Sequence, residues 1–217
     1  MTASSYLHSV RASYDAVAVD CARLLGTDLA GKPLDRAVLG AFAECVRGER
    51  GGPGRAVADL GCGPGRVTAH LDGLGVRTFG VDLSPAMVAV ARRTYPGLRF
   101  EVGSMAALDV ADGVLGGVLA WYSTVHTPPS ELPGVFAEFA RVLAPGGHAL
   151  VAFEAGDERV RLDHAYGHPV DLDVYRIPPD RIAALLAGAG LAEAARLVRE
   201  PTPHEVSQQG FLLARKS

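Results

Sequence analysis

Hydrophobic residues in the first quarter of the chain recur at helical spacing. Apolar positions three and four residues apart run from Ser5 to Leu25 and again from Leu34 to Val46, which is the spacing of one face of an α-helix. Gly31-Lys32-Pro33 breaks the pattern between the two segments. The polar, glycine-rich residues 48–54 follow as a flexible connection. We therefore expect residues 1–50 to form a helical cap on the main domain.

After this connection the pattern changes to short apolar runs that alternate with helical segments. Such alternation is typical of an α/β fold with a mostly parallel sheet. The runs predict strands at residues 56–60, 78–81, 98–102, 114–121, 149–153 and 210–214. One helix is expected to start at Ser84, a capping residue followed by proline. Further helices are expected over residues 131–143 and 178–188.

Residues 155–177 are less regular than the rest of the chain. The stretch is polar at first and then alternates, with aliphatic residues at positions 170, 172 and 174 between polar ones. We predict a loop and a short strand. Because a connection of this length usually has a function, we expect it to form a lid over a substrate.

Composition narrows the class of protein. The 217 residues, 48% hydrophobic and 21% charged, fit one domain spanning residues 1–217. No apolar run approaches the roughly 20 residues that span a bilayer, and the N-terminus lacks signal-peptide character. A net charge of -3 with scattered arginines argues against a nucleic-acid partner. We expect a cytoplasmic monomer or homodimer that does not bind membranes.

The three cysteines, Cys21, Cys45 and Cys62, are widely separated and form no Cys-x-x-Cys pair. This number and spacing predict neither a disulfide framework nor a zinc site, and no metal is expected. Cys62 lies among glycines, where a thiol could act as a nucleophile. No base stands beside it in the sequence, so we interpret it as a small packing residue.

A glycine-rich turn, Asp59-Leu60-Gly61-Cys62-Gly63-Pro64-Gly65, links the first predicted strand to a helical segment. Glycines adopt backbone angles closed to other residues and let a ligand touch the main chain. The Gly-x-Gly-x-Gly spacing differs from the Gly-x-Gly-x-x-Gly of dinucleotide sites. Asp59 would repel a pyrophosphate but attract the ammonium and sulfonium of S-adenosylmethionine. The turn therefore favours S-adenosylmethionine, with a purely structural turn as the alternative.

Asp82 ends the second predicted strand of the sheet. An acidic residue at this place binds ribose hydroxyls in open α/β folds. The alternative is that Asp82 only belongs to the turn before Ser84. Because it follows the glycine turn along the chain, we interpret it as a ligand of the cofactor.

These motifs resemble those of class I S-adenosylmethionine-dependent methyltransferases, and the likeness runs from about Ala56 to the C-terminus. Residues 59–65 resemble the first motif of the family and residues 80–87 the second. Residues 141–147, which end in Pro-Gly-Gly, resemble a late signature. The resemblance implies a doubly wound, seven-stranded, mostly parallel sheet with helices on both faces and an antiparallel last strand.

The resemblance also implies contacts to the cofactor. Family members often have an acidic residue for the adenine after the third strand, whereas this chain has Ser104 and Met105. The Ser104 hydroxyl or the backbone would make that contact, and Met105 would pack on the ring. Tyr14 resembles a tyrosine that closes over the methionine end, or it is simply one face of an amphipathic helix. The expected cofactor-binding residues are Tyr14, Asp59, Gly61, Cys62, Gly63, Gly65, Asp82, Leu83, Met87, Ser104, Met105, Ala120 and Trp121.

The methyl acceptor is expected beside residues 120–129, which follow the fourth strand of the sheet. Methyl transfer needs alignment and, for a hydroxyl or amine, removal of a proton. His126, with an ordinary pKa of about 6.5, is the candidate base and Tyr122 a second catalytic candidate; alternatively His126 only supports its loop. His164 and Tyr166 are expected to face the substrate from the lid. The lid's Asp and His residues fit no established metal-ligand spacing.

The sequence thus predicts transfer of a methyl group from S-adenosylmethionine to a small molecule, at an oxygen, nitrogen or carbon atom, with S-adenosylhomocysteine as the product. Two other functions remain open at this stage. One is a regulatory protein that binds the cofactor without transferring its methyl group. The other, an NAD-dependent oxidoreductase, rests only on the shared fold.

Overall fold

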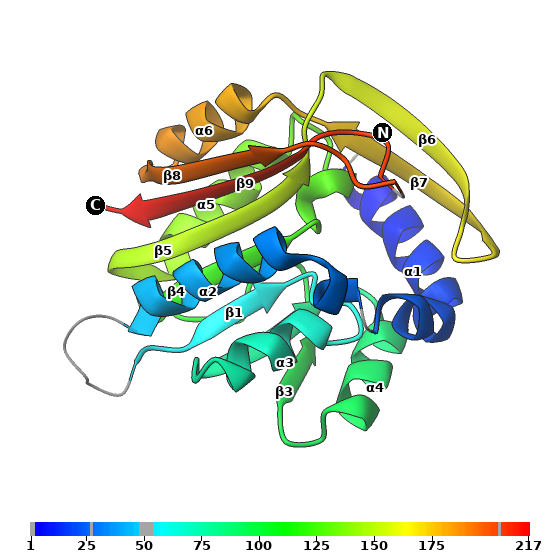
Figure 1. Cartoon of the computed structure of the whole chain (residues 1–217), viewed down its shortest axis with the longest axis horizontal. Coiled ribbons are helices and arrows are strands. Elements are labelled where there is room, and N and C mark those ends of the chain that lie inside the picture. The colour runs from blue at the N-terminus through cyan, green and yellow to red at the C-terminus, as the bar shows by residue number, and fades with distance from the viewer. Residues whose placement is uncertain (1–2, 27, 48–53, 204) are drawn as a thin grey trace.

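The computed structural model describes residues 3–26, 28–47, 54–203 and 205–217, so most of the connection expected at 48–54 lies outside the described residues. A seven-stranded sheet with the order β3-β2-β1-β4-β5-β9-β8 forms the centre (Figure 1). The strands are β1 (Val57–Leu60), β2 (Thr78–Asp82), β3 (Arg99–Val102), β4 (Leu115–Trp121), β5 (Leu143–Glu154), β8 (Leu191–Arg199) and β9 (Gln209–Lys216).

Strands β1 to β5 pair in parallel, and β9 runs antiparallel to both of its neighbours. This arrangement confirms the predicted sheet, including its antiparallel last strand. The strand order reverses between β1 and β4, which are adjacent although β2 and β3 separate them in the chain. At such a reversal the loops after the two strands diverge, leaving a crevice at their carboxyl ends.

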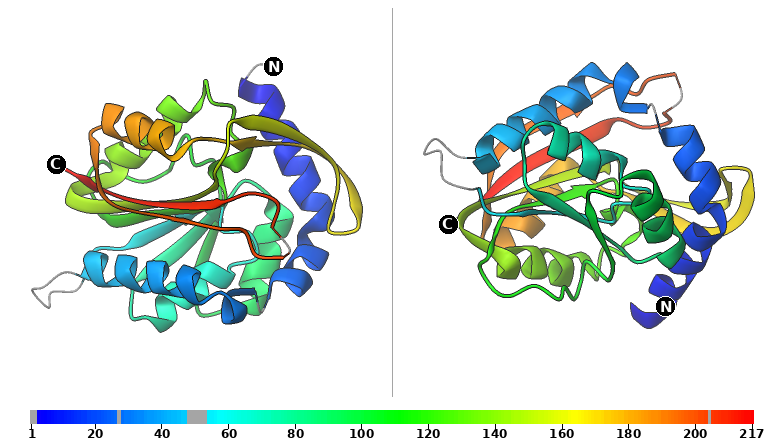
Figure 2. Two further views of the ribbon diagram at one scale, coloured as in Figure 1. Left: turned by 45° about the horizontal axis from the view of Figure 1, so that its top comes forward. Right: turned by 90° about the horizontal axis from the view of Figure 1, so that it is seen from below.

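Helices cover both faces of the sheet, as predicted. On one face α2 (Pro33–Arg47) and α3 (Arg66–Gly73) bury Phe42 and Leu71 against residues such as Leu119 of β4. On the other face α5 (Leu132–Val142) and α6 (Pro179–Gly188) bury Phe136 and Leu186. Side chains alternate along β4, so consecutive residues of this strand join different clusters. Figure 2 shows the sheet between these two helical layers.

The two N-terminal helices have different positions. Helix α2 belongs to the layer on the sheet face, whereas α1 (Ala3–Leu25) lies beside α4 (Pro85–Thr94) and the strand β7 (His168–Arg176), at the carboxyl ends of the parallel strands (Figure 2). A short 3-10 helix, η1 (Asp28–Gly31), joins them, and a second, η2 (Thr124–His126), follows β4. Of α1 and α2, only α1 has described residues that line the crevice.

Residues 155–177 form a hairpin of two long strands, β6 (Glu158–Ala165) and β7 (His168–Arg176), rather than a loop with one short strand. Tyr166 and Gly167 connect them with φ values of 53° and 84°, the paired positive angles of a tight two-residue hairpin turn. In β6, exposed arginines alternate with the half-buried Val160 and Leu162. The alternation is visible in the sequence, but the arginines make this segment resemble a polar loop.

Strand β8 was not among the strands that we predicted from the apolar runs. Its sequence, Leu191 to Arg199, is rich in alanine, leucine and arginine, residues that favour helices. It lies at the sheet edge with most of its side chains exposed, and pairing with β9 overrides the local preference.

No helix in the described parts of the chain combines the length and the apolar character needed to cross a membrane.

Candidate functional site

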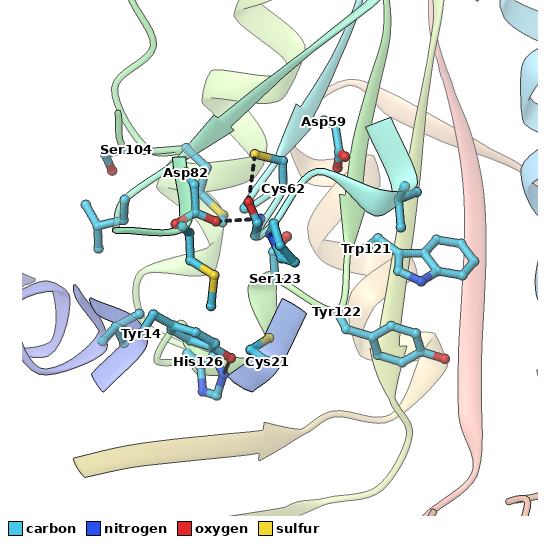
Figure 3. Close-up of a pocket in the computed structure, with 18 of the residues that line it drawn as sticks. Tyr14, Cys21, Asp59, Cys62, Asp82, Ser104, Trp121, Tyr122, Ser123 and His126 are labelled. Carbon is cyan, nitrogen blue, oxygen red and sulfur yellow. Dashed lines mark hydrogen bonds between the residues drawn. The ribbon is translucent and has the colours of Figure 1, made fainter. Parts of the chain in front are cut away.

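A cavity lies at the carboxyl ends of the parallel strands, under α1 (Figure 3). The turn after β1, the end of β2 and the segment after β4 form its floor and sides, and α1 closes it. Asp82 and Ser104 lie on one side, with Trp121 and Tyr122 on the other. The cavity therefore occupies the crevice created by the reversed strand order.

The glycines of the turn have separate roles. Gly61, Gly63 and Gly65 have φ values of 70°, 54° and 85°, angles that side chains rarely tolerate. A Cβ on Gly61 would lie 2.3 Å from Cβ of Ser123, and one on Gly65 would lie 2.7 Å from the Phe100 ring. A Cβ on Gly63 would meet no heavy atom within 4 Å. Two glycines thus allow close packing, whereas Gly63 keeps the cavity wall open.

Asp59, at the end of β1, is a buried carboxylate that is only partly hydrogen-bonded. Thr68 Oγ1 donates to its Oδ2 at 2.6 Å, while Oδ1 is buried without a hydrogen-bond partner. Burial raises the pKa of Asp59 to about 6, although the Thr68 hydrogen bond and the positive charge of Arg66 act in the opposite direction. A cation bound beside Asp59 would stabilise its ionised form.

Asp82 holds the glycine turn and the next helix together. Its Oδ2 accepts the N–H of Gly63 at 2.8 Å, drawn as a dashed line in Figure 3, and its Oδ1 accepts the N–H of Ser84 at 2.8 Å. Burial raises the pKa of Asp82, against the effect of these two bonds. Each oxygen has a second lone pair, so Asp82 can accept two further donors.

Helix α1 is fixed to the start of α4 by Asp15. Its Oδ1 accepts hydrogen bonds from Ser84 Oγ at 2.5 Å and from the N–H of Ala86 at 3.1 Å. Ser84 Oγ in turn accepts the N–H of Met87 at 3.1 Å, the capping role expected for it. A carboxylate at a helix N-terminus also interacts favourably with the helix dipole.

His126 is 8% exposed and links three elements. Its Nδ1 lies 2.7 Å from the backbone oxygen of Asp173 in β7, and its Nε2 lies 2.6 Å from the hydroxyl of Tyr14 in α1. A carbonyl oxygen only accepts, so Nδ1 carries a hydrogen and donates it. Neutral His126 then accepts the Tyr14 hydroxyl at Nε2. Burial lowers the pKa of His126, which favours this neutral form.

Tyr122 is at a backbone position with φ of 55°, immediately after β4. Its ring packs edge-on against Trp121 and Phe211, and its hydroxyl is buried without a hydrogen-bond partner. Burial raises the pKa of Tyr122, so the phenol stays protonated at neutral pH. This backbone conformation is rare for a bulky residue.

Most of the residues expected at the site line this one cavity. They are Tyr14, Asp59, Gly61, Cys62, Gly63, Asp82, Leu83, Met87, Ser104, Met105, Trp121, Tyr122, His126 and Tyr166. Three others lie outside the lining: Gly65 faces Phe100, Ala120 is fully buried under the sheet's helical layer, and His164 is exposed on β6. The hairpin turn brings Tyr166, and not His164, to the cavity.

The sequence predicted Tyr14 of α1 at the site, but not the other residues of α1 that line the cavity, nor two polar groups after β4. Tyr6, Leu7, Val10, Cys21 and Leu25 line the cavity from one side of α1. Their helical spacing was visible in the sequence, but a spacing does not reveal which element a helix faces. The lining also includes Arg66, Gly103, Ser123 and Thr127, which were not among the predicted site residues.

The acidic and histidine residues of the hairpin are engaged in contacts of other kinds. Asp173 pairs with Arg159 at 2.8 Å, and His168 Nε2 lies 2.8 Å from Asp20 of α1. In the described ranges, no group of three or more His, Cys, Asp or Glu residues could hold a metal ion.

Comparison with known proteins gives a family for the region around this cavity. Residues 57–147 match the model of a methyltransferase domain. A demethylmenaquinone methyltransferase of Chlorobaculum parvum is 34% identical over 96 residues, 44% of this chain and 39% of the relative. A trans-aconitate 2-methyltransferase of Delftia acidovorans is 34% identical over 116 residues, 51% of this chain and 41% of the relative. The matched regions span less than half the length of these relatives.

One solved structure is similar over nearly the whole chain. Magnesium protoporphyrin IX methyltransferase from Synechocystis PCC 6803, crystallised with S-adenosylmethionine, superposes with a TM-score of 0.75. The alignment covers 98% of this chain and 97% of that protein at 17% sequence identity. At this identity the likeness concerns the fold.

Proposed function

We propose that this chain, whose residues 57–147 match a methyltransferase domain, transfers a methyl group from S-adenosylmethionine to a small organic molecule, at an oxygen, nitrogen or carbon atom, releasing S-adenosylhomocysteine. The observation that carries the proposal is one cavity lined by the buried carboxylate of Asp59, the half-buried carboxylate of Asp82, an open glycine turn and the buried His126. Each of these features matches a separate requirement of the reaction.

The residues present fit the cofactor. Gly63 leaves open space at the wall, Asp82 has lone pairs for ribose hydroxyls, and Asp59 has a buried oxygen without a partner. Leu83, Met87, Ser104 and Met105 would surround the adenine, while Gly61 and Cys62 would offer main chain to the methionine end. When bound, the cofactor supplies an electrophilic methyl group on a positively charged sulfur.

The charges on the cavity side favour this cofactor over a dinucleotide. Asp59 brings a buried carboxylate to the glycine turn, and it would repel a pyrophosphate. An ammonium beside Asp59 would instead satisfy its free oxygen. Asp59 would therefore select against NAD.

We assign the proton-removing step to His126 acting with Tyr14. The Tyr14 hydroxyl donates to Nε2 of His126, and its own oxygen keeps lone pairs. A hydroxyl or amine acceptor would give its proton to the Tyr14 oxygen while Tyr14 passes its hydrogen to His126. The Asp173 carbonyl would then hold the protonated ring at Nδ1. Tyr122 and Trp121 would position the acceptor from the opposite side.

The hairpin of residues 155–177 would act as the lid of the site. Strand β7 is bonded to α1 through Ser13 Oγ, which accepts the N–H of Asp171 at 3.0 Å, and Tyr166 reaches the cavity from the turn. For the whole protein we propose a cytoplasmic monomer or homodimer without a nucleic-acid partner, consistent with three free cysteines and a net charge of -3.

The proposal is tested by methyl transfer into a mixture of metabolites. The protein is incubated with S-adenosylmethionine labelled in its methyl group and a small-molecule extract, and labelled products are separated from the cofactor. We expect label in a product of low molecular mass and an equal amount of S-adenosylhomocysteine. Binding of the cofactor without labelled product would contradict transfer and indicate a protein that only senses it.

A further inference from the structure

Arg66 is the first residue of α3 and follows the glycine turn directly. Its side chain is 15% exposed and lines the cavity. Among the described residues that line this cavity, it is the only lysine or arginine. The positive charge is therefore placed at one end of the turn, and Asp59 at the other.

The guanidinium of Arg66 has few hydrogen-bond or ion-pair partners among the described residues. Its Nη1 is buried without a hydrogen-bond partner, and its Nη2 lies 3.6 Å from Oδ2 of Asp28. Asp28 is itself shared with Lys32 at 3.1 Å. By contrast, the similarly covered Arg199 contacts Asp35 at 3.1 Å and Glu205 at 2.6 Å. A guanidinium has five donors, and leaving them unpaired on burial is costly.

The opposite charge lies close enough for Arg66 to influence it. Burial raises the pKa of Asp59, and the Arg66 charge is among the influences that lower it. The burial-raised pKa of Cys21 is lowered by the same charge. The charge of Arg66 therefore acts on Asp59 of the glycine turn and on Cys21 of α1.

We propose that Arg66 binds the carboxylate at the amino-acid end of S-adenosylmethionine, while Asp59 binds the ammonium of the same group. This inference rests on the proposed function. An amino-acid zwitterion carries both charges on one carbon, so a cation and an anion flanking one glycine turn complement it. A guanidinium matches a carboxylate in geometry and charge. A carboxylate on the methyl acceptor is the alternative ligand of Arg66, and the test below distinguishes the two.

The test compares two ligands that differ only in this carboxylate. Calorimetry measures the dissociation constants of S-adenosylmethionine and of its decarboxylated form for the wild-type protein and for Arg66→Gln. We expect the wild type to prefer the intact cofactor. In Arg66→Gln, binding of the intact cofactor should weaken about 10- to 100-fold, as expected for hydrogen bonds to a charged group. The decarboxylated ligand should bind both proteins equally.

Two further variants separate binding from structure. Asp28→Asn removes the ion-pair partner of Arg66 and should bind the intact cofactor at least as tightly as the wild type. Arg66→Lys keeps the charge and should recover part of the lost affinity. Equal weakening of both ligands in Arg66→Gln would assign Arg66 a structural role and overturn the inference. So would unchanged binding of the intact cofactor, which would leave the acceptor's carboxylate as the ligand of Arg66. Failure of the wild type to bind either ligand would reject the proposed function itself.

Discussion

At the scale of single residues, several groups of the site have an energetically unfavourable charge state or backbone conformation. Asp59 is ionised at neutral pH although it is buried, and His126 is kept neutral between Tyr14 and a backbone carbonyl. Tyr122 has a left-handed backbone. Such costs are tolerated where a ligand or a reaction makes use of them. Each group therefore gives a measurable effect of pH or substitution.

Asp59→Asn should stabilise the ligand-free protein at alkaline pH. The folded-state pKa of about 6 is above the unfolded value, so the folded state holds more protons between pH 4 and 6. The contribution of Asp59 to the free energy of unfolding therefore falls as pH rises through this window. Two pKa units correspond to about 3 kcal/mol, an upper figure. Urea denaturation should find the variant about 1 to 3 kcal/mol more stable at pH 8 and similar at pH 4.

The exposed Asp72, in α3, provides the control for this experiment. Asp72→Asn should not reproduce the pH-dependent gain. A difference between Asp59→Asn and the wild type that is the same at pH 4 and pH 8 would mean that ionisation of Asp59 is not the cause.

His126→Asn and Tyr14→Phe should each slow methyl transfer. The His126 variant should bind the cofactor with nearly unchanged affinity. Loss of a positioned base typically costs about 100-fold or more in rate. Since burial lowers the pKa of His126 below its usual 6.5, the wild-type rate should be constant from pH 6.5 to 8 and fall only below that range. The measurement is the rate at which a labelled product forms from S-adenosylmethionine labelled in its methyl group. Wild-type turnover in His126→Asn would show that alignment of the reactants suffices.

At the scale of elements, the cavity depends on how α1 is attached. Asp15 connects α1 to the start of α4, and the hairpin holds α1 from the other side through Ser13 and Asp20. An apolar cluster that includes Val17 of α1 and Met87 of α4 packs these elements together as well. The polar contacts therefore add to this packing in holding α1 over the cavity.

Asp15→Ala should loosen α1 and weaken cofactor binding. Both hydrogen bonds to Asp15 end on its Oδ1, so Asp15→Asn can retain them and lose only the charge at the start of α4. We expect about 1 kcal/mol of lost stability for the alanine variant and less for asparagine. Hydrogen exchange should accelerate in α1 and not in β4 or β5. Unchanged exchange in α1 of the alanine variant would refute this attachment.

How far the elements could be predicted depended on whether their signals were local. Ser84 followed by proline marked the start of α4, and short, mostly apolar runs marked β1 and β4, because capping and burial on both faces leave direct traces. Strand β8 left none, because its alanines and charges suit a helix and only its pairing with β9 makes it a strand.

The candidate site divides in the same way. Motif residues such as Asp59 and Asp82 could be predicted because the turns that hold them are contiguous in sequence. The link between Tyr14 and His126 could not, since it joins residues 112 positions apart. Arg66 was adjacent to the motif, but its missing partner became visible only in three dimensions.

At the scale of the whole molecule, one topological feature gathers the site. The reversal of strand order between β1 and β4 opens the crevice, and the antiparallel pair β9 and β8 extends the sheet on the side away from the cofactor motifs. The N-terminal helix and the hairpin, far apart in the chain, both lie at the carboxyl ends of the strands (Figure 1). We therefore expect the methyl acceptor to enter the cavity between the N-terminal helix and the hairpin.

The most direct test of this account is calorimetric titration of the protein with S-adenosylhomocysteine, with NADH as the comparison ligand. We predict one molecule of S-adenosylhomocysteine bound per chain and no heat of binding from NADH. Asp82→Ala should weaken binding by about 1.5 to 3 kcal/mol, the usual value of hydrogen bonds to a charged group. Absence of binding in the wild type, or binding of NADH with similar affinity, would contradict the assignment of this cavity to S-adenosylmethionine.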